Sequence, residues 1–373
     1  MKSNPYSFVL LTGLFMMFNG PTYGQLPRLK EAYQDIFYIG TALNRWQISD
    51  KDSCASGIIT SQFSSITPEN ILKWQFVHPK PDRYDFDASD QFVALGKKNG
   101  MFIVGHALVW HAQTPRWVFQ DSSGASLDRE ALLARMKEHI LTVVGRYKGQ
   151  INGWDVVNEA IEDDGQLRKS PWLNIIGEDY IQKAFEFARE ADPDAELYYN
   201  DYSMYHKGRR ERVVKLVRNL QDKGIRVDGI GLQAHWGLDY PSLDELETSI
   251  IAYAQTGAKV MITEMDISAL PNPYDYRGAD IARRFQLSPE NNPYSDGLPD
   301  SMQVRLAERY KEIFALFVKH RDKISRVTLW GIHDRQSWKN NFPIRGRTDY
   351  PLLFDRECQP KKAFFSVIEA AQE

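Results

Sequence analysis

The segment NGWDVVNEA, from Asn152 to Ala160, decides the fold that we predict for this chain. It begins with a turn pair, continues through an apolar centre, and ends in the amide of Asn158 and the carboxyl group of Glu159. A buried strand that ends in a polar, ionisable residue indicates that this end opens into a cleft. Further along, KVMITEMDI repeats the pattern with Glu264 and Asp266. Carboxylates at two strand ends suit paired acid/base or nucleophile chemistry.

Short apolar segments alternate with longer amphipathic ones along the rest of the chain. We expect strands near 37–41, 65–67, 102–107, 153–157, 197–199, 229–232, 260–263 and 327–330, and helices between them, for example at 128–147, 178–191, 207–223, 243–256 and 302–319. Eight such units without a linker predict a single-domain (β/α)8 TIM barrel. The alternative, an open doubly wound sheet, would need a Gly-rich phosphate turn after the first strand, and Gly40-Thr41-Ala42-Leu43 is not one.

The first residues have the pattern of a secretory signal peptide. Lys2 precedes an apolar run from Phe8 to Phe18, and small residues, Thr22 and Gly24, stand shortly before Gln25. The apolar run is too short to span a bilayer as a helix. We therefore expect residues 1–24 to be removed, residues 25–373 to form the barrel domain, and the protein to be exported to the periplasm or secreted.

The composition is that of an ordinary globular protein. The 373 residues are 43% hydrophobic and 25% charged, with a formal net charge of -3. This balance gives no electrostatic support for a nucleic-acid or membrane-surface partner, and we expect a monomer. Cys54 and Cys358 are the only cysteines. An exported protein could join them, but so large a core does not need a disulfide, and the sequence leaves their pairing open.

A barrel places the residues that follow its strands around one opening. Nearly every predicted strand ends in hydrogen-bonding or aromatic residues, namely Asn44, Glu69, Asn70, His106, Trp110, Asn158, Glu159, Asn200, Asp201, Gln233, His235, Glu264, Asp266, Trp330 and, beyond it, Trp338. Such sets bind sugars, because sugar rings stack on aromatic side chains and hydroxyls pair with amides, imidazoles and carboxylates. A carboxylate pair in this setting indicates glycoside hydrolysis. The long connection 267–301 is predicted to be a loop at the rim.

A metal-dependent hydrolase is an alternative, with His106 and His235 as metal ligands. Metal-dependent barrels need a His-x-His or similar pattern near the first strand, and residues 41–44 contain no histidine. We instead predict that no metal or cofactor is used. Asp266 follows Glu264 by two residues, so both side chains point to the same face of the strand. We expect Asp266 to hold His235, and His235 to orient Glu264. The other six histidines are predicted to be structural or exposed.

Seven segments occur in a fixed order along the chain: ITPENILKW (Ile66–Trp74), GHALVWHAQTPRW (Gly105–Trp117), WDVVNEA (Trp154–Ala160), YYNDY (Tyr198–Tyr202), GIGLQAHW (Gly229–Trp236), ITEMDI (Ile262–Ile267) and WGIHDRQSW (Trp330–Trp338). In these segments the chain resembles the glycoside hydrolase family 10 endo-β-1,4-xylanases. The resemblance covers essentially all of the chain from Leu26 to Glu373.

The resemblance implies a retaining endo-xylanase that acts on xylan and xylo-oligosaccharides by double displacement. Glu159 would be the acid/base and Glu264 the nucleophile. Asn158 would bind the 2-hydroxyl of the sugar whose bond is cleaved. The same subsite would be lined by Lys73, His106, Trp110, Gln233, His235 and Trp330. The next sugar toward the non-reducing end would be held by Glu69, Asn70, Gln113 and Trp338.

The chain departs from the family pattern at four positions. Leu72 stands where Met is common, Met265 where Leu is common, His333 where Thr is common, and Lys362 where Pro is frequent. Of these, we expect His333 to lie at the rim and to alter substrate fit. Two other functions stay open at this point: a barrel glycosidase acting on another β-1,4-glucan or at chain ends, and a carbohydrate-binding protein that has lost catalysis. The intact carboxylate pair argues against the second.

Overall fold

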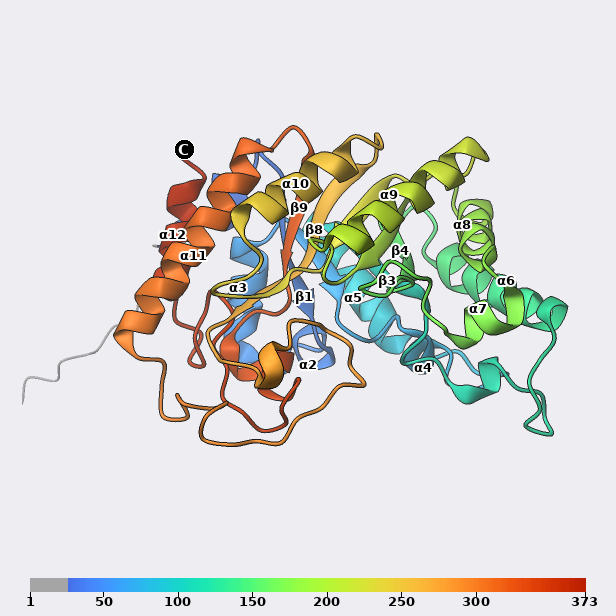
Figure 1. Cartoon of the computed structure of the whole chain (residues 1–373), viewed down its shortest axis with the longest axis horizontal. Helices are drawn as coiled ribbons and strands as arrows, with labels where there is room; N and C mark the ends of the chain where they lie inside the picture. Colours follow the sequence, from blue (N-terminus) through green and yellow to red (C-terminus); the bar gives the residue numbers. More distant parts are fainter. Residues whose placement is uncertain (1–25) are drawn as a thin grey trace, which may run out of the picture.

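The computed structural model describes residues 26–373, so the predicted signal peptide, residues 1–24, lies outside the described residues. Eight parallel strands form a closed barrel, which confirms the predicted fold (Figure 1). The barrel strands are β1 (Tyr38–Leu43), β2 (Ser65–Pro68), β3 (Phe102–Trp110), β4 (Gly153–Asn158), β5 (Glu196–Asp201), β6 (Gly229–Leu232), β8 (Lys259–Ser268) and β9 (Ile324–Leu329). Pairing of β6 with β8 and of β9 with β1 closes the ring, and the short β7 (His235–Gly237) extends it along the end of β8.

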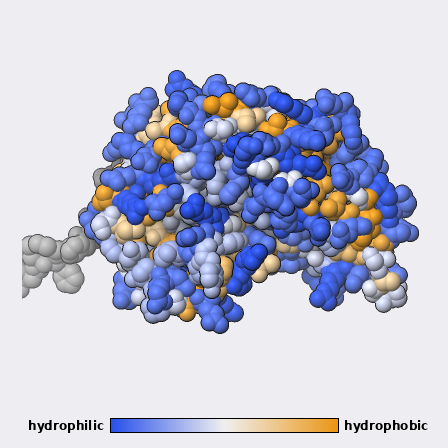
Figure 2. Space-filling view, in the orientation of Figure 1, coloured by the Kyte–Doolittle hydropathy of each residue, from blue (hydrophilic) through white to orange (hydrophobic). Residues whose placement is uncertain are grey.

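Helices between the strands surround the barrel. They are α1 (Leu29–Ala32), α2 (Arg45–Ile48), α3 (Ser53–Gln62), α4 (Trp74–Val77), α5 (Asp87–Lys98), α6 (Arg129–Arg146), α7 (Pro171–Ile176), α8 (Tyr180–Ala191), α9 (Lys207–Asp222), α10 (Leu243–Ala254), α11 (Asp300–Lys319) and α12 (Lys362–Ala370), with short 3-10 turns η2 (Arg116–Val118), η3 (Pro273–Asp275), η4 (Asp334–Gln336) and η5 (Trp338–Asn340). None of the described helices is long and apolar enough to cross a membrane. The face in Figure 2 is mainly hydrophilic, with apolar residues in small separate groups.

Side-chain periodicity explains how the layers pack. The buried residues of α6 recur at helical spacing, at Leu132, Met136, Ile140 and Val143, so one stripe of the helix faces the barrel. On the barrel side, Gly105 leaves room for the ring of Trp154, because a Cβ at Gly105 would lie 2.1 Å from a ring atom.

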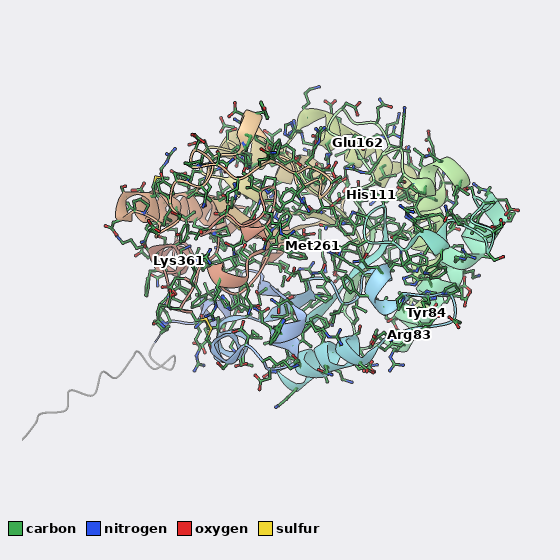
Figure 3. The ribbon with its side chains drawn as sticks, turned by 90° about the horizontal axis from the view of Figure 1, so that it is seen from below. Arg83, Tyr84, His111, Glu162, Met261 and Lys361 are labelled. Atoms are coloured by element: carbon green, nitrogen blue, oxygen red, sulfur yellow. A yellow bond between two sulfur atoms is a disulfide. The ribbon has the colours of Figure 1, made fainter. Side chains whose placement is uncertain are left out.

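The interior of the barrel is filled by side chains that point inward. Val104, Tyr198 and Met261 form a buried group there. Met261 lies near the centre of Figure 3, which views the molecule from below with respect to Figure 1. The interior is therefore a packed core, and the strand ends are where this fold places a ligand.

Several strands extend beyond their predicted ends, and β8 and β3 do so by the most residues. β8 continues through Glu264 and Asp266 to Ser268, and β3 continues through His106 to Trp110. The strand predicted for β8 stopped at Thr263, before these polar side chains, whereas the strand predicted for β3 stopped at Ala107, after His106. These polar groups have hydrogen-bond partners from neighbouring strands, so the buried strands can continue past them. The segment from Ala269 to Pro299 contains one 3-10 turn and runs along the lower edge of Figure 1, as predicted for a rim loop.

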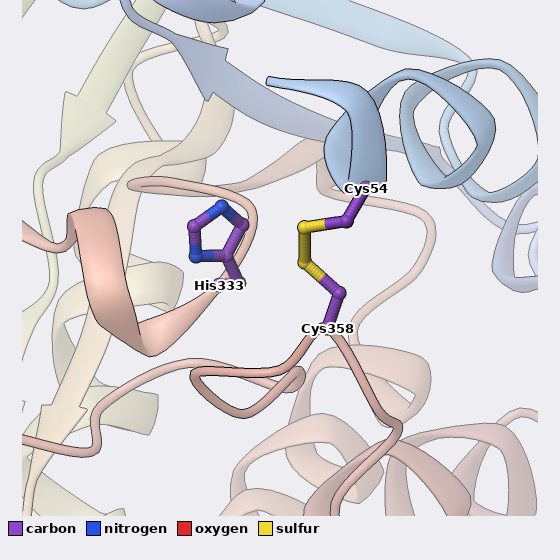
Figure 4. Close-up of side chains that lie close together, drawn as sticks. All are labelled: Cys54, His333 and Cys358. Atoms are coloured by element: carbon purple, nitrogen blue, oxygen red, sulfur yellow. A yellow bond between two sulfur atoms is a disulfide. The ribbon is translucent and has the colours of Figure 1, made fainter.

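A disulfide bond joins Cys54 of α3 to Cys358, which precedes α12 (Figure 4). The two residues are 304 positions apart, so the bond connects the two ends of the described chain. The sequence left this pairing open because a large core can be stable without it. A cross-link over so long a loop stabilises the fold mainly by restricting the unfolded chain.

Reduction of this bond should lower the free energy of unfolding by about 2–5 kcal/mol, because the unfolded chain regains the entropy of an open loop. Thermal unfolding with and without dithiothreitol measures the change. Because the chain has only two cysteines, the variant Cys54→Ser/Cys358→Ser should unfold at one temperature in both conditions. An unchanged melting temperature in wild-type protein whose thiols are shown to be free by mass spectrometry would contradict this account.

Candidate active site

One cavity at the carboxyl ends of the strands brings the predicted site residues together. It has a volume of about 100 Å³ and is lined by both predicted catalytic glutamates and all eleven predicted substrate-binding residues: Glu69, Asn70, Lys73, His106, Trp110, Gln113, Asn158, Glu159, Gln233, His235, Glu264, Trp330 and Trp338. The rim loop adds Ala279 and Ile281. The location of these residues agrees with the sequence, while the role of each one stays a prediction.

Glu159 follows β4 and its carboxyl group is buried. Trp110 Nε1 donates to its Oε2 at 2.8 Å, and Gln233 Nε2 donates to its Oε1 at 3.0 Å. Burial, with a further contribution from the negative charge of Asp201, raises the pKa of Glu159 to about 7, although both hydrogen bonds oppose the shift. At neutral pH this carboxyl group is therefore protonated in a large fraction of molecules, as a general acid must be.

The backbone of Glu159 has the left-handed conformation, with φ of 58°. This conformation costs roughly 1–2 kcal/mol for a residue with a Cβ and persists only where the surroundings fix it. Here, the N–H of Glu159 donates to the carbonyl of Asn200, and Arg168 Nε donates to the carbonyl of Glu159, both at 2.9 Å. Arg168 in turn donates to the hydroxyl of Tyr202. The turn after β4 is thus fixed in the direction that points Glu159 into the cavity.

Glu264 lies within β8 and faces the same cavity. Asn200 Nδ2 donates to its Oε1 at 2.7 Å, and His235 Nε2 lies 3.3 Å from its Oε2. Burial alone would raise the pKa of Glu264, but the hydrogen bond from His235 and nearby positive charges, including that of Lys73, hold it below its usual value. Glu264 is therefore ionised at the pH at which Glu159 still carries its proton.

His235 is held from behind by Asp266, as predicted. Its Nδ1 lies 3.0 Å from Asp266 Oδ2, which also accepts a hydrogen bond from Trp338 Nε1 at 2.7 Å. Burial would lower the pKa of His235, but Asp266 and Glu264 raise it above its usual value. In its protonated form, the ring donates from Nδ1 to Asp266 and from Nε2 to Glu264. Asp266 therefore orients the group that stabilises the charge of Glu264.

The next part of the cavity is lined by a fixed set of polar groups. Asn70 Oδ1 accepts from Lys73 Nζ at 3.1 Å and from Gln113 Nε2 at 3.3 Å, while Asn70 Nδ2 donates to Glu69 at 3.0 Å. Lys73 Nζ lies 4.7 Å from the centre of the Trp110 ring. Because these groups hold one another in place, they can bind sugar hydroxyls without first becoming ordered.

Three residues that support the site were not among the site residues predicted from the sequence. Asn200 bridges Glu264 and Asn158 through its amide, with Nδ2 2.9 Å from Asn158 Oδ1. Asp155 lies 2.8 Å from Nδ1 of His106, and Arg168 holds the backbone of Glu159. Two of the three had a signal in the sequence. Asn200 stands at a strand end, and Asp155 is a charged residue within an apolar strand. Arg168 lies in a connection and gave no such signal.

Cys54, Cys358 and His333 form a Cys/His group whose candidate ligand atoms lie within 4.8 Å of one another (Figure 4). The sequence did not predict this group. Its two sulfurs are bonded to each other, so neither is a thiolate that could bind a metal ion. His333 is fully buried, and its Nε2 lies 2.8 Å from Asp52 Oδ2. The expectation that His333 lies at the rim is therefore wrong, because its ring forms part of a buried polar pair beneath the surface.

Titration of the two glutamates tests the electrostatics of the site. In protein with ¹³C-labelled carboxyl groups, NMR should show one glutamate with a pKa of about 7, and this signal should be absent from Glu159→Gln and present in Glu264→Gln. The signal of Glu264 should titrate below the usual glutamate range, because His235 and Lys73 favour its charged form. If the signal near pH 7 were instead lost from Glu264→Gln, the two environments would be reversed.

Comparison with known proteins places this site in a family. A sequence model of the family described as Glycosyl hydrolase family 10 matches residues 28–370. The chain is 45% identical over 343 residues to "Endo-1,4-beta-xylanase A" of Xylanibacter ruminicola, covering 92% of this chain and 93% of that protein. It is 44% identical over 349 residues to "Endo-1,4-beta-xylanase" of Geobacillus stearothermophilus, covering 92% and 98% of the two chains.

Comparison with solved structures points to the same family. The structure titled "Structure of a novel GH10 endoxylanase retrieved from sugarcane soil metagenome" superposes with a TM-score of 0.89 at 48% identity, and the match covers 91% of this chain and 99% of that one. The family model, the relatives and the superposition all extend over most of the chain, so the chain belongs to glycosyl hydrolase family 10.

Proposed function

We propose that this protein is a retaining endo-1,4-β-xylanase, which hydrolyses internal β-1,4 bonds of xylan. Relatives that are 44–45% identical over nine-tenths of the chain are named as such enzymes. The observation that carries the mechanism is that Glu159 and Glu264 face one cavity with pKa values shifted in opposite directions. A proton donor and a charged nucleophile are what the first step of double displacement requires.

In the first step, the carboxylate of Glu264 bonds to the anomeric carbon, and the bond from that carbon to the leaving oxygen breaks. The proton of Glu159 moves to the leaving oxygen. In the second step, a water molecule gives its proton to Glu159, and its oxygen displaces Glu264 from the anomeric carbon. The first step leaves Glu159 ionised, so that it can accept a proton from water, and the second step returns Glu159 to its protonated form. The product keeps the β configuration.

The shape of the cleft favours internal bonds over chain ends. A second cavity of about 820 Å³ adjoins the catalytic one and shares Glu69, Asn70 and Trp338 with it. Sugars beyond the subsite of Glu69 and Asn70 therefore have space to continue, whereas an enzyme that removes terminal sugars needs a wall there.

We also propose where the enzyme acts and which partners it needs. The predicted signal peptide supports export to the periplasm or secretion, where polymeric xylan is accessible. Near-neutral net charge supports action without nucleic acid, and we expect the enzyme to work as a monomer that needs no cofactor.

The sugar preference follows from the fixed position of Trp338. Its Nε1 donates to Asp266, and its ring stacks on Phe342 with centroids 4.4 Å apart. Glucose carries a hydroxymethyl group on C5 that xylose lacks, and we expect Gln113 and Trp338 to crowd this group. Strain of roughly 1–3 kcal/mol should make kcat/KM at least about tenfold higher on xylo-oligosaccharides than on matched cello-oligosaccharides. Trp338→Ala should reduce the ratio of kcat/KM on xylo-oligosaccharides to kcat/KM on cello-oligosaccharides. Equal values for the wild-type enzyme would favour a general β-1,4-glucanase.

Substitution of the two glutamates separates their roles. Glu159→Ala should lose on the order of 10²–10⁴-fold in rate on xylan, where the leaving group needs a proton. On an aryl xylobioside, whose nitrophenolate leaves without one, the first step should persist, the glycosyl-enzyme should accumulate, and azide should restore turnover and yield a β-glycosyl azide. Glu264→Ala should be almost inactive on both substrates because no intermediate forms.

The matched control for both variants is Glu178→Ala, which removes an exposed carboxylate outside the cavity and should behave as the wild-type enzyme does. Any azide product from Glu264→Ala should have the α configuration, because azide would then displace the leaving group directly. A β-azide from Glu264→Ala, combined with none from Glu159→Ala, would exchange the two roles.

A further inference from the structure

A group of side chains around the disulfide bond is not used by the mechanism above. Cys54 of α3, Cys358 before α12 and His333 after β9 each offer one sulfur or nitrogen atom, and these three atoms lie within 4.8 Å of one another (Figure 4). The Cα atoms of the two cysteines are 6.1 Å apart. The disulfide occupies both sulfurs in the oxidised chain, whereas a reduced chain has two thiols beside one imidazole. Two thiolates and an imidazole are donors that zinc prefers.

Asp52 lies next to this group and supplies a further oxygen. Its Oδ2 is engaged, because it lies 2.8 Å from Nε2 of His333 and accepts from Gln336 Nε2 at 2.8 Å. Its Oδ1 has one polar contact among residues 26–373, the sulfur of Cys54 at 3.5 Å. Although Asp52 directly precedes α3, its side chain does not cap the helix. Oδ1 is therefore a fourth donor beside the same sulfur, and four donors complete a structural zinc site.

The ring of His333 is placed to act as a ligand through Nε2. This nitrogen is on the side of Asp52, whose other oxygen contacts Cys54. The ring is fully buried, and Nδ1 has no hydrogen-bond partner in the described part of the chain. Because nothing there donates to Nδ1, that nitrogen can carry the ring proton while Nε2 presents its lone pair to an ion.

The surroundings of Cys54 favour both reduction and ion binding. Cys54 is half-buried and Cys358 is fully buried, so a reductant reaches the bond from the side of Cys54. The exposed Arg335 lies with Nη2 3.5 Å from the sulfur of Cys54. Its positive charge favours a thiolate over a thiol. Two thiolates and a carboxylate carry three negative charges, which a divalent ion and Arg335 together balance.

We propose that the reduced protein binds one zinc ion through Cys54, Cys358, His333 and Asp52. Reduction adds two electrons and two protons to the disulfide, and a phosphine supplies them as it takes an oxygen atom from water. Each thiol loses its proton when its sulfur bonds to the ion. The ion then joins the same two parts of the chain that the disulfide joins in the oxidised protein. The catalytic glutamates take no part, so the inference does not depend on the proposed xylanase function.

Cobalt(II) is the probe for this site, because it accepts the ligands of zinc and absorbs strongly in the visible range when thiolates bind it in a tetrahedral site. The full chain is reduced with a phosphine, its fold is checked by circular dichroism, and cobalt is titrated without oxygen. The reduced wild-type protein should develop these bands at one ion per chain, and zinc should abolish them. The disulfide-bonded protein should develop none. Zinc should also raise the unfolding temperature of the reduced protein above that measured in EDTA.

Variants assign the ligands. His333→Gln and Asp52→Asn should each weaken cobalt binding at least about tenfold, and Cys54→Ser/Cys358→Ser should show no bands. The matched control, His206→Gln, removes an exposed histidine at the start of α9 and should bind cobalt as the wild-type protein does.

Three results would overturn the inference. The first is a reduced, folded wild-type protein that shows no bands with excess cobalt. The second is an unchanged affinity in His333→Gln or in Asp52→Asn. The third is a reduced chain that unfolds and does not refold when zinc is added, because an ion bound to the folded state alone must favour that state.

Discussion

Two buried carboxyl groups that must hold different protonation states in one small cavity set the main physical constraint on this structure. Burial raises the pKa of both, so the charged state of Glu264 exists only because Asn200, His235 and Lys73 stabilise it. The charge of Arg168 also favours ionised Glu159, but burial and the negative charge of Asp201 outweigh it, and Glu159 keeps its proton to about pH 7. The difference between the two glutamates therefore arises from their neighbours, because the side chains themselves are identical.

The barrel meets this constraint by bringing neighbouring strand ends together. Asn200, which donates to Glu264, lies in β5, and His235, the imidazole beside Glu264, lies in β7. Asp266, which orients His235, lies in β8 with Glu264 itself. A rigid ring of strands fixes the relative positions of these groups, whereas loops alone would leave them mobile. The left-handed backbone of Glu159 is stabilised in the same way, by Asn200 of β5 and by Arg168.

The fold, the paired glutamates and the lining of the cavity were predictable because strand periodicity and the residues after each strand are local features of the sequence. What the sequence did not reveal depends on contacts between distant segments. Cys54 and Cys358 meet only because the two ends of the chain pack together, and His333 lies beneath the surface because Asp52 of another segment provides its partner. The continuation of β8 past Glu264 likewise depends on hydrogen bonds from other strands. Asn200 was visible as a strand end, but its role as a bridge required the geometry.

Covalent trapping of the nucleophile tests the central claim of this account most directly. A 2-fluoro xylobioside with a good leaving group slows both steps, and the second more than the first, so the glycosyl-enzyme can be isolated. After proteolysis, mass spectrometry should find the fluorinated disaccharide on the peptide that contains Glu264, bound through its carboxyl group. Attachment to Glu159 instead, or stoichiometric inactivation without any label on Glu264, would contradict the assignment of a charged nucleophile to β8.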